Sequence, residues 1–268
     1  MERRAFLAAS TAATLAHTPT LAAAAGRPGQ ETAGGSTLLL ELRRYRLRNG
    51  PMAARFSAYA KDALVPALGR AGITPVGAWN VSVGPDSPTL HLLIPHAKPE
   101  SLLTLEARLE ADAEYLRAAA PLLALPPADP PFLGCDSSLH ATVATLPDVR
   151  KPTGPAASAS RVFELRSYRS PSEPAGRKKI EMFEAGGELA IFARLGMHTV
   201  FFSRDLVGAG LPCLTYMLAF ADAGAREQAW AAFREDPAWL RLRAQPAFAD
   251  IVSEIDAALL RPTDYSQL

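Results

Sequence analysis

The sequence has few of the features that indicate a function directly. Its 268 residues contain only two cysteines, Cys135 and Cys213, too few for a disulfide scaffold or a thiolate metal cluster, although the two could pair with each other. The 28 basic and 27 acidic side chains nearly balance, which gives no electrostatic argument for a nucleic-acid partner. No G-x-G-x-x-G, Walker A or G-x-S-x-G motif occurs. Dinucleotide, nucleotide and ordinary serine-hydrolase functions therefore lose support, and we expect neither a cofactor nor a metal.

The first 25 residues resemble a twin-arginine export signal. Arg3 and Arg4 precede a mildly apolar run of alanine, threonine and leucine, and Ala23 and Ala25 fit the small-x-small rule for cleavage. We therefore expect residues 1–25 to be a signal peptide that engages the twin-arginine export machinery through the two arginines. The mature protein is expected to be periplasmic or secreted.

The apolar run of this signal is too short and too interrupted for a membrane span. His17 and Pro19 break it, and a span requires about 20 apolar residues. The glycine-rich, polar residues 26–36 that follow are typical of a flexible lead-in. We expect no membrane span.

The rest of the chain contains an internal repeat. The segment LELRRYR at 40–46 recurs as FELRSYR at 163–169, and a D-x-x-(Y/W)-L-R segment occurs at both 112–117 and 236–241. The repeat also aligns Gly72 with Gly196. We therefore predict three segments after the lead-in: a first copy over 37–148, a linker over 149–160 that is rich in Pro, Gly, Ala and Ser, and a second copy over 161–268.

Hydrophobic periodicity predicts the order β-α-β-β-α-β within each copy. In the tail of the second copy, helical spacing competes with the repeat, and we follow the repeat, which predicts a strand over 253–261. This order is that of a ferredoxin-like unit, so we predict an α+β fold of two tandem ferredoxin-like repeats. In the first copy the predicted elements are a strand at 38–47, a helix at 52–68, strands at 74–83 and 89–95, a helix beginning near 101, and a final strand within 137–148.

The doubled F/L-E-L-R-x-Y-R start, the glycine after the first helix, the D-x-x-(Y/W)-L-R segment and the closing LLRPTDYSQL together resemble the NIPSNAP family. The resemblance covers nearly all of residues 38–268. It implies a dimeric α+β barrel, in which two ferredoxin-like sheets face one another, formed here within one chain. NIPSNAP proteins have no settled catalytic activity, so the resemblance says more about the fold than about the function.

The repeated first strand carries the candidate ligand-binding residues. Side chains alternate along a strand, so leucines share one face and polar residues the other. We expect the leucine face, with Leu40 and Leu42, to meet the helices, and the polar face to line the space between the sheets. Buried Glu and Arg two residues apart could instead satisfy each other, and both interpretations stay open. The polar residues form a first row, Glu41, Arg43 and Tyr45, and a second row, Glu164, Arg166 and Tyr168.

Four histidines follow the predicted signal. His91 and His198 lie on predicted strands and could face the cavity, so we add them to the candidate ligand-binding residues. We expect His96 and His140 at the surface. None of the four forms an HExxH pair or a close cluster of metal-ligating residues.

These observations favour a protein that binds a small polar or amphipathic ligand between the two sheets. A first alternative is an enzyme of the cofactor-free or haem-dependent oxygenase or decarboxylase type, which rests on fold-level analogy. A second alternative is a structural or interaction protein with a packed interior. Whether the protein forms a homo-oligomer is also left open.

Overall fold

The computed structural model describes residues 37–153 and 158–268. The predicted signal peptide with Arg3 and Arg4, the predicted lead-in and part of the predicted linker lie outside the described residues.

The predicted β-α-β-β-α-β order occurs in the first half of the described chain, with each helical part divided into several helices. Its elements are β1 (Leu39–Arg46), α1 (Pro51–Tyr59), the π-helical η1 (Ala60–Leu64), α2 (Val65–Arg70), β2 (Gly77–Val83), β3 (Thr89–His96), α3 (Pro99–Leu103), α4 (Leu105–Glu110), α5 (Ala113–Leu123) and β4 (Gly134–Thr142).

The second half repeats this order and ends on a strand, which confirms the choice of the repeat over helical spacing in the tail. Its elements are the 3₁₀ turn η2 (Ser158–Ser160), β5 (Val162–Arg169), α6 (Glu173–Phe183), α7 (Glu188–Arg194), β6 (His198–Val207), β7 (Cys213–Phe220), α8 (Ala223–Glu235), α9 (Pro237–Arg243), the 3₁₀ turn η3 (Pro246–Phe248) and β8 (Glu254–Pro262).

The repeated sequence motifs are helix boundaries. Asp112 accepts a hydrogen bond from the backbone N–H of Tyr115 at the start of α5, and Asp236 accepts from that of Trp239 at the start of α9. Each aspartate thus satisfies a donor that the first helical turn leaves unpaired. After α2 and α7, the aligned glycines Gly72 and Gly196 both have φ of 72°, a left-handed conformation that favours glycine.

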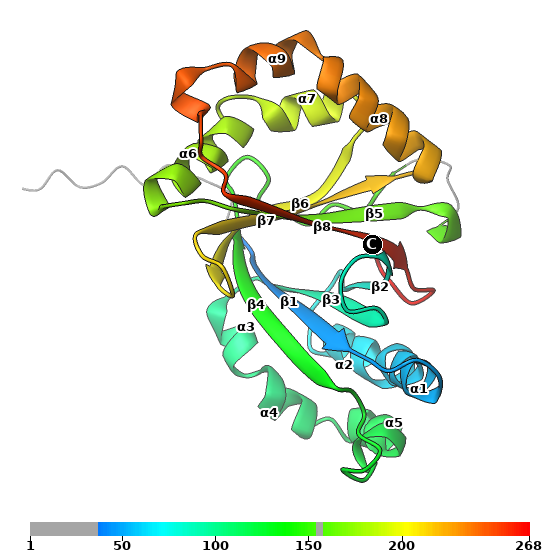
Figure 1. Ribbon diagram of the computed structural model, residues 1–268. Coiled ribbons are helices and arrows are strands. Elements are labelled where there is room, and N and C mark those ends of the chain that lie inside the picture. The colour runs from blue at the N-terminus through cyan, green and yellow to red at the C-terminus, as the bar shows by residue number, and fades with distance from the viewer. Residues whose placement is uncertain (1–36, 154–157) are drawn as a thin grey trace, which may run out of the picture. The chain divides into compact units, whose positions relative to one another are not determined.

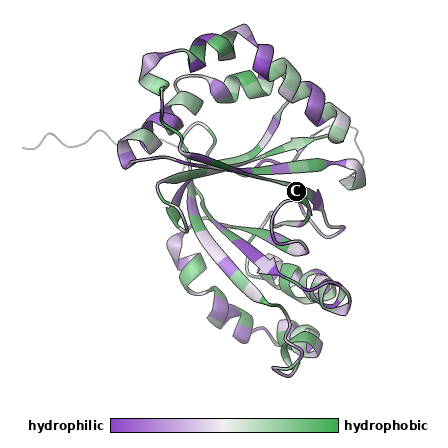
Figure 2. Ribbon diagram, viewed as in Figure 1, coloured by the Kyte–Doolittle hydropathy of each residue, from purple (hydrophilic) through white to green (hydrophobic). Residues whose placement is uncertain are grey.

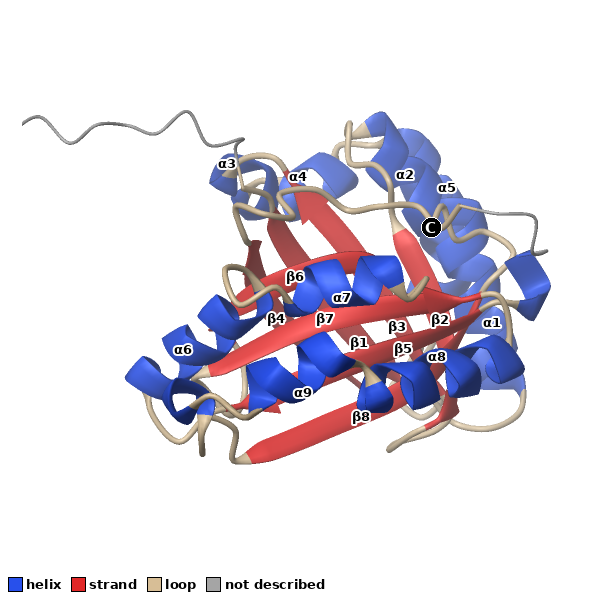
Figure 3. Cartoon of the chain, turned by 90° about the horizontal axis from the view of Figure 1, so that it is seen from above, coloured by secondary structure: helices blue, strands red, loops and turns tan. Residues whose placement is uncertain are grey.

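Within the described residues, the eight strands form one closed antiparallel barrel in the order β1-β3-β2-β8-β5-β7-β6-β4. The first half contributes β4-β1-β3-β2 and the second half β8-β5-β7-β6, and the pairs β2–β8 and β4–β6 join them. Figure 1 shows the helices of the first half on one side of the barrel and those of the second half on the other. Figure 3 shows α6 to α9 crossing over the strands of the second half.

Both faces of the barrel wall are therefore covered. One apolar cluster fills part of the interior, and two others lie between the sheet and the helices. Figure 2 shows hydrophobic and hydrophilic residues on the strands as well as on the helices. The interior cluster consists of Leu40, Leu42, Trp79, Leu93, Phe163, Leu165, Val200, Phe201, Met217, Ala219, Leu260 and Leu268.

This arrangement corrects our assignment of the strand faces. Leu40 and Leu42 point into the barrel, whereas Tyr45 packs under the helices against Phe56, with ring centroids 4.6 Å apart. The alternation itself holds, but the polar rows lie on the helix side of the wall. The assignment failed because a barrel covered by helices buries both sheet faces, so an apolar face does not by itself indicate where the helices lie.

Candidate functional site

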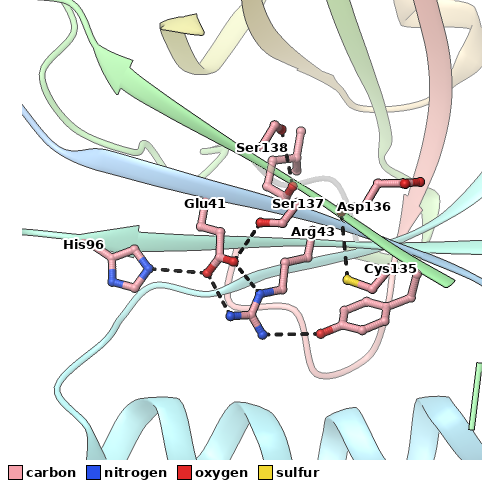
Figure 4. A network of polar contacts seen from close by, with 9 residues as sticks. Glu41, Arg43, His96, Cys135, Asp136, Ser137 and Ser138 are labelled. Carbon is pink, nitrogen blue, oxygen red and sulfur yellow. Dashed lines mark hydrogen bonds and ion pairs between the residues drawn. The ribbon is translucent and has the colours of Figure 1, made fainter. Parts of the chain in front are cut away.

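The first row (Glu41, Arg43, Tyr45) forms a network of polar contacts beneath the helices of the first half. Arg43 donates to both carboxylate oxygens of Glu41, at 2.7 and 3.0 Å, and to the Tyr45 hydroxyl at 3.4 Å. Ser137 donates to Glu41 at 2.8 Å, and His96 Nε2 lies 3.7 Å from Glu41 Oε2 (Figure 4). Burial raises the pKa of Glu41, but the contacts with His96 and Arg43 outweigh it and hold that pKa at about 2.

The second row (Glu164, Arg166, Tyr168) is similarly bonded. Glu164 is fully buried and accepts hydrogen bonds from Arg166 at 2.6 Å and from Arg226 and Trp230 of α8, each at 2.7 Å. Arg166 also donates to the Tyr168 hydroxyl at 3.2 Å. The contacts in both rows are those expected of mutually satisfied ion pairs, and ligand binding by either row stays a prediction.

A cavity of about 330 Å³ opens at one end of the barrel interior. It is lined by residues near the ends of β1, β2, β5 and β6 and near the starts of β3, β4, β7 and β8, and we call it the barrel-end pocket. Its floor meets the apolar interior cluster at Leu42 and Leu165. The polar and reactive groups that line it include Arg44, His91, Asp136, Ser138, His140, Ser167, Arg169, Asp205, Cys213, Thr215 and Asp256.

The cations of this pocket are paired at its rim. Arg44 donates to Asp136 at 3.0 Å, and Arg169 lies 2.5 Å from Glu254 and 2.6 Å from Asp256. These pairs are partly exposed, so they contribute little to stability. They leave the pocket polar at its mouth and apolar at its floor.

His91 is the predicted candidate that the structure places in the pocket. The side chain is 6% exposed, and its Nδ1 has no hydrogen-bond partner among the described residues. Burial, with a smaller contribution from Arg44, lowers the pKa of His91 to about 4. The ring is therefore neutral near pH 7, and its Nδ1 is a buried polar atom without a partner among the described residues.

A chain of hydrogen bonds runs along the pocket wall from β4 through β6 and β7 to β5. Ser138 Oγ lies 2.7 Å from His140 Nε2, and His140 Nδ1 lies 2.8 Å from Asp205 Oδ1. The second carboxylate oxygen, Asp205 Oδ2, accepts from Thr215 at 3.0 Å. Thr215 in turn lies 3.0 Å from the Ser167 hydroxyl.

The other three histidines do not all lie where the sequence predicts. His140 is 2% exposed and His96 is fully buried, so the expectation of surface positions is wrong for both. His198 is half-buried and lies 3.3 Å from the carbonyl oxygen of Arg150, outside the residues that line the barrel-end pocket. The structure therefore brings His91, but not His198, to this site.

Sequence reasoning missed Ser138, His140 and Asp205. A Ser-x-His segment on a strand places both side chains on one face, which was a usable signal. Asp205 comes from the other half of the chain and meets His140 only through the β4–β6 pairing that closes the barrel. A β-bulge lies at this point, between Leu139 and His140, and bulges commonly redirect side chains beside functional sites.

Within the described residues, no group of three or more His, Cys, Asp and Glu side chains could hold a metal ion. No helix there is long and apolar enough to cross a bilayer. Cys135 and Cys213, which could have formed a disulfide, are free thiols.

Comparison with known proteins gives a family and a fold. The model of the NIPSNAP family matches residues 40–124 and 163–267. No curated protein sequence matches the chain.

Among solved structures, a candidate monooxygenase from Fusobacterium nucleatum is similar with a TM-score of 0.57 and 9% identity, over 85% of this chain and 93% of that one. Another, from Lactobacillus acidophilus, has a TM-score of 0.55 and 8% identity, over 84% and 94%. A NIPSNAP family protein from Agrobacterium tumefaciens is 22% identical over 40% of this chain and 98% of that one, with a TM-score of 0.36. The likeness to the two candidate monooxygenases shows the fold alone.

Proposed function

This chain belongs to the NIPSNAP family, and we propose that it binds a small molecule with at least one polar group in the barrel-end pocket. The observation that carries the proposal is the cavity itself, which has the neutral His91 ring in its lining, with the Nδ1 of that ring unpaired among the described residues. A buried polar atom without a partner costs about 1–3 kcal/mol, a cost that a ligand hydrogen bond would remove.

The lining defines the chemistry of the ligand. Arg44 is the register partner of His91 in the β1–β3 pair and adds N–H donors at the rim of the pocket, where it also pairs with Asp136. These donors favour a ligand with a carbonyl or carboxylate oxygen. Leu42, Val81 and Leu165 offer the rest of the molecule an apolar floor. A cavity of about 330 Å³ is at the small end of known ligand sites.

Acetophenone, which combines a carbonyl oxygen with a phenyl ring, is a suitable probe of this pocket. We expect saturation-transfer NMR to detect its binding to the full-length protein and to His198→Leu, and to give about tenfold weaker binding to His91→Leu. His198→Leu is the matched control because His198 lies outside the pocket. Equal binding by His91→Leu and the native protein would contradict the proposal. So would the absence of binding, together with no retained ligand in native mass spectrometry.

The oxygenase or decarboxylase alternative is weaker. It is supported by the candidate monooxygenases among the structural neighbours, which are 8 and 9% identical to this chain. Likeness at that level concerns architecture and not chemistry. A fully packed interior is also less favoured, because the polar end of the barrel contains the cavity.

We also propose that the two halves are tandem ferredoxin-like units that form a dimeric α+β barrel within one chain. Their strand orders, β4-β1-β3-β2 and β8-β5-β7-β6, support this because each places the first and third strands of a half at its centre. Export through the twin-arginine route stays a proposal that rests on residues 1–25.

A further inference from the structure

The donor and the acceptor of each hydrogen bond between Ser138, His140 and Asp205 follow from the chemistry of the three side chains. An ionised carboxylate only accepts hydrogen bonds, so Asp205 requires the proton of a neutral His140 ring to be on Nδ1. The lone pair of Nε2 then accepts from the Ser138 hydroxyl, 2.7 Å away. Ser138 Oγ has a second, longer contact of 3.4 Å with the carbonyl oxygen of Leu42.

The surroundings hold this arrangement in place. His140 is 2% exposed, the side chain of Asp205 is 8% exposed, and Thr215 donates to the second carboxylate oxygen. Ser138 is partly exposed and lines the barrel-end pocket. A hydroxyl within hydrogen-bond reach of a base that a third group orients is the arrangement typical of nucleophilic catalysis.

We propose that Ser138 is a nucleophile, that His140 is its general base, and that Asp205 is a positioning residue that orients His140. The substrate class is a small carboxylic ester bound in the barrel-end pocket, so this inference rests on the proposed function. The absence of a G-x-S-x-G motif does not conflict with it. That motif describes a serine at a strand-to-helix turn, whereas Ser138 lies within β4 and a triad is recognised by its geometry.

The reaction requires only the ester and water. Ser138 Oγ bonds to the carbonyl carbon while its proton passes to His140 Nε2. The bond to the alcohol oxygen breaks, and the alcohol leaves with that proton. Water then attacks the acyl-serine and gives a proton to His140, the acyl–Oγ bond breaks, and Ser138 regains the proton as the acid leaves. Arg44 and His91 are among the pocket residues with groups that could donate to the carbonyl oxygen.

Two further features concern the space beside Ser138 and the reactivity of a neighbouring thiol. A Cβ placed on Gly208 would lie 3.3 Å from the Ser138 Cβ, so the glycine keeps the loop close to Ser138 without crowding it. Cys213 is the thiol in the lining of the pocket. Burial, with a contribution from Asp205, raises the pKa of its thiol to about 12, which keeps Cys213 protonated and unreactive.

Covalent labelling of the full-length protein tests the nucleophile. A fluorophosphonate loses fluoride when a serine oxygen bonds to its phosphorus, and peptide mass spectrometry locates the adduct. We expect the adduct on Ser138, its loss in Ser138→Ala, and its retention in Ser137→Ala, whose missing hydroxyl faces Glu41 on the opposite side of the wall (Figure 4). Labelling that is absent, or that persists in Ser138→Ala, overturns the inference.

Hydrolysis of phenyl acetate separates this inference from the proposed function. We expect Ser138→Ala to lower kcat/KM for phenyl acetate by about 100-fold or more. If the native protein binds acetophenone but neither hydrolyses phenyl acetate nor is labelled, the inference fails and the proposed function stands. If it does not bind acetophenone, retains no ligand in native mass spectrometry and shows neither reaction, both fail.

Asp205→Asn tests the positioning role. An asparagine amide can donate to Nδ1, which moves the ring proton to Nε2 and removes the acceptor for Ser138. We expect the rate of fluorophosphonate labelling at pH 7 to fall about 100-fold. We also expect the inflexion in the plot of labelling rate against pH to shift. If labelling is slower at every pH but the inflexion is unchanged, Asp205 has only a structural role. That result would overturn its assignment as a positioning residue.

Discussion

The hydroxyls of Ser137 and Ser138, neighbours on β4, lie on opposite faces of the barrel wall. Ser137 Oγ donates to Glu41 at 2.8 Å under the helices, whereas Ser138 Oγ lies 2.7 Å from His140 Nε2 inside the barrel. The wall thus separates two polar systems, the ion-paired rows on its outer face and the barrel-end pocket inside. Substitutions in one system should leave the other largely unchanged.

The outer system should contribute stability and not binding. Removing the carboxylate in Glu164→Ala leaves Arg166 and Arg226 without their acceptor next to a buried sheet face, so we expect a loss of about 3–5 kcal/mol in the free energy of unfolding. Urea denaturation measures it, and acetophenone binding to the folded variant should be unchanged. Glu227→Ala, at an exposed position on the same helix as Arg226, is the control and should change stability by less than about 0.5 kcal/mol. Weakened acetophenone binding in folded Glu164→Ala would contradict the separation.

His91 should make the fold sensitive to mild acid. Its pKa is about 4 in the folded protein and about 6.5 when unfolded. Between these values the unfolded chain binds a proton that the folded chain does not, so stability falls as pH decreases from 6.5 to 4. Protonation of His91 alone should lower the free energy of unfolding by about 3 kcal/mol over this range. Urea midpoints measured across this range give the slope.

The variant His91→Leu isolates that contribution. It removes both the titrating ring and the unpaired Nδ1, and we expect its unfolding free energy at pH 7 to equal or exceed that of the native protein by about 1 kcal/mol. The slope between pH 6.5 and 4 should be shallower than in the native protein. An unchanged slope would mean that His91 does not cause the loss of stability between pH 6.5 and 4.

The two aligned glycines should be equally intolerant of a side chain. Gly72 and Gly196 both have φ of 72°, and an added Cβ would meet no atom within 4 Å among the described residues. Any cost of Gly→Ala is therefore conformational, about 1–2 kcal/mol at each site. Gly69 has equally open surroundings but lies within α2, so Gly69→Ala should stabilise the protein by up to about 1 kcal/mol. Thermal melts of the three variants compare these values, and equal effects at all three sites would contradict the argument.

The element order could be predicted because each copy of the repeat constrains the other. The strand at the end of the second copy, β8, was predicted against its own helical spacing because the first copy has a strand there. The inner face could not be predicted, since alternation shows only that Leu40 and Leu42 share a face and not which layer covers it. The sequence wrongly predicts His140 at the surface, for a related reason. Its partner Asp205 lies on a strand that joins it only when the two halves close into a barrel, and nothing local in the sequence encodes that pairing.

Export depends on a part of the chain outside the described residues and has its own test. The twin-arginine machinery recognises the arginine pair itself, so the double variant Arg3→Lys and Arg4→Lys keeps the charge of the signal but loses its recognition. In a host with this machinery, we expect the native chain to appear in the periplasm, shortened by about 25 residues, and the double variant to remain in the cytoplasm at full length. Arg27→Lys, the same exchange beyond the predicted cleavage point, should be exported as the native chain is. Cell fractionation with immunoblotting and intact mass spectrometry distinguishes these outcomes, and normal export of the double variant would contradict the assignment.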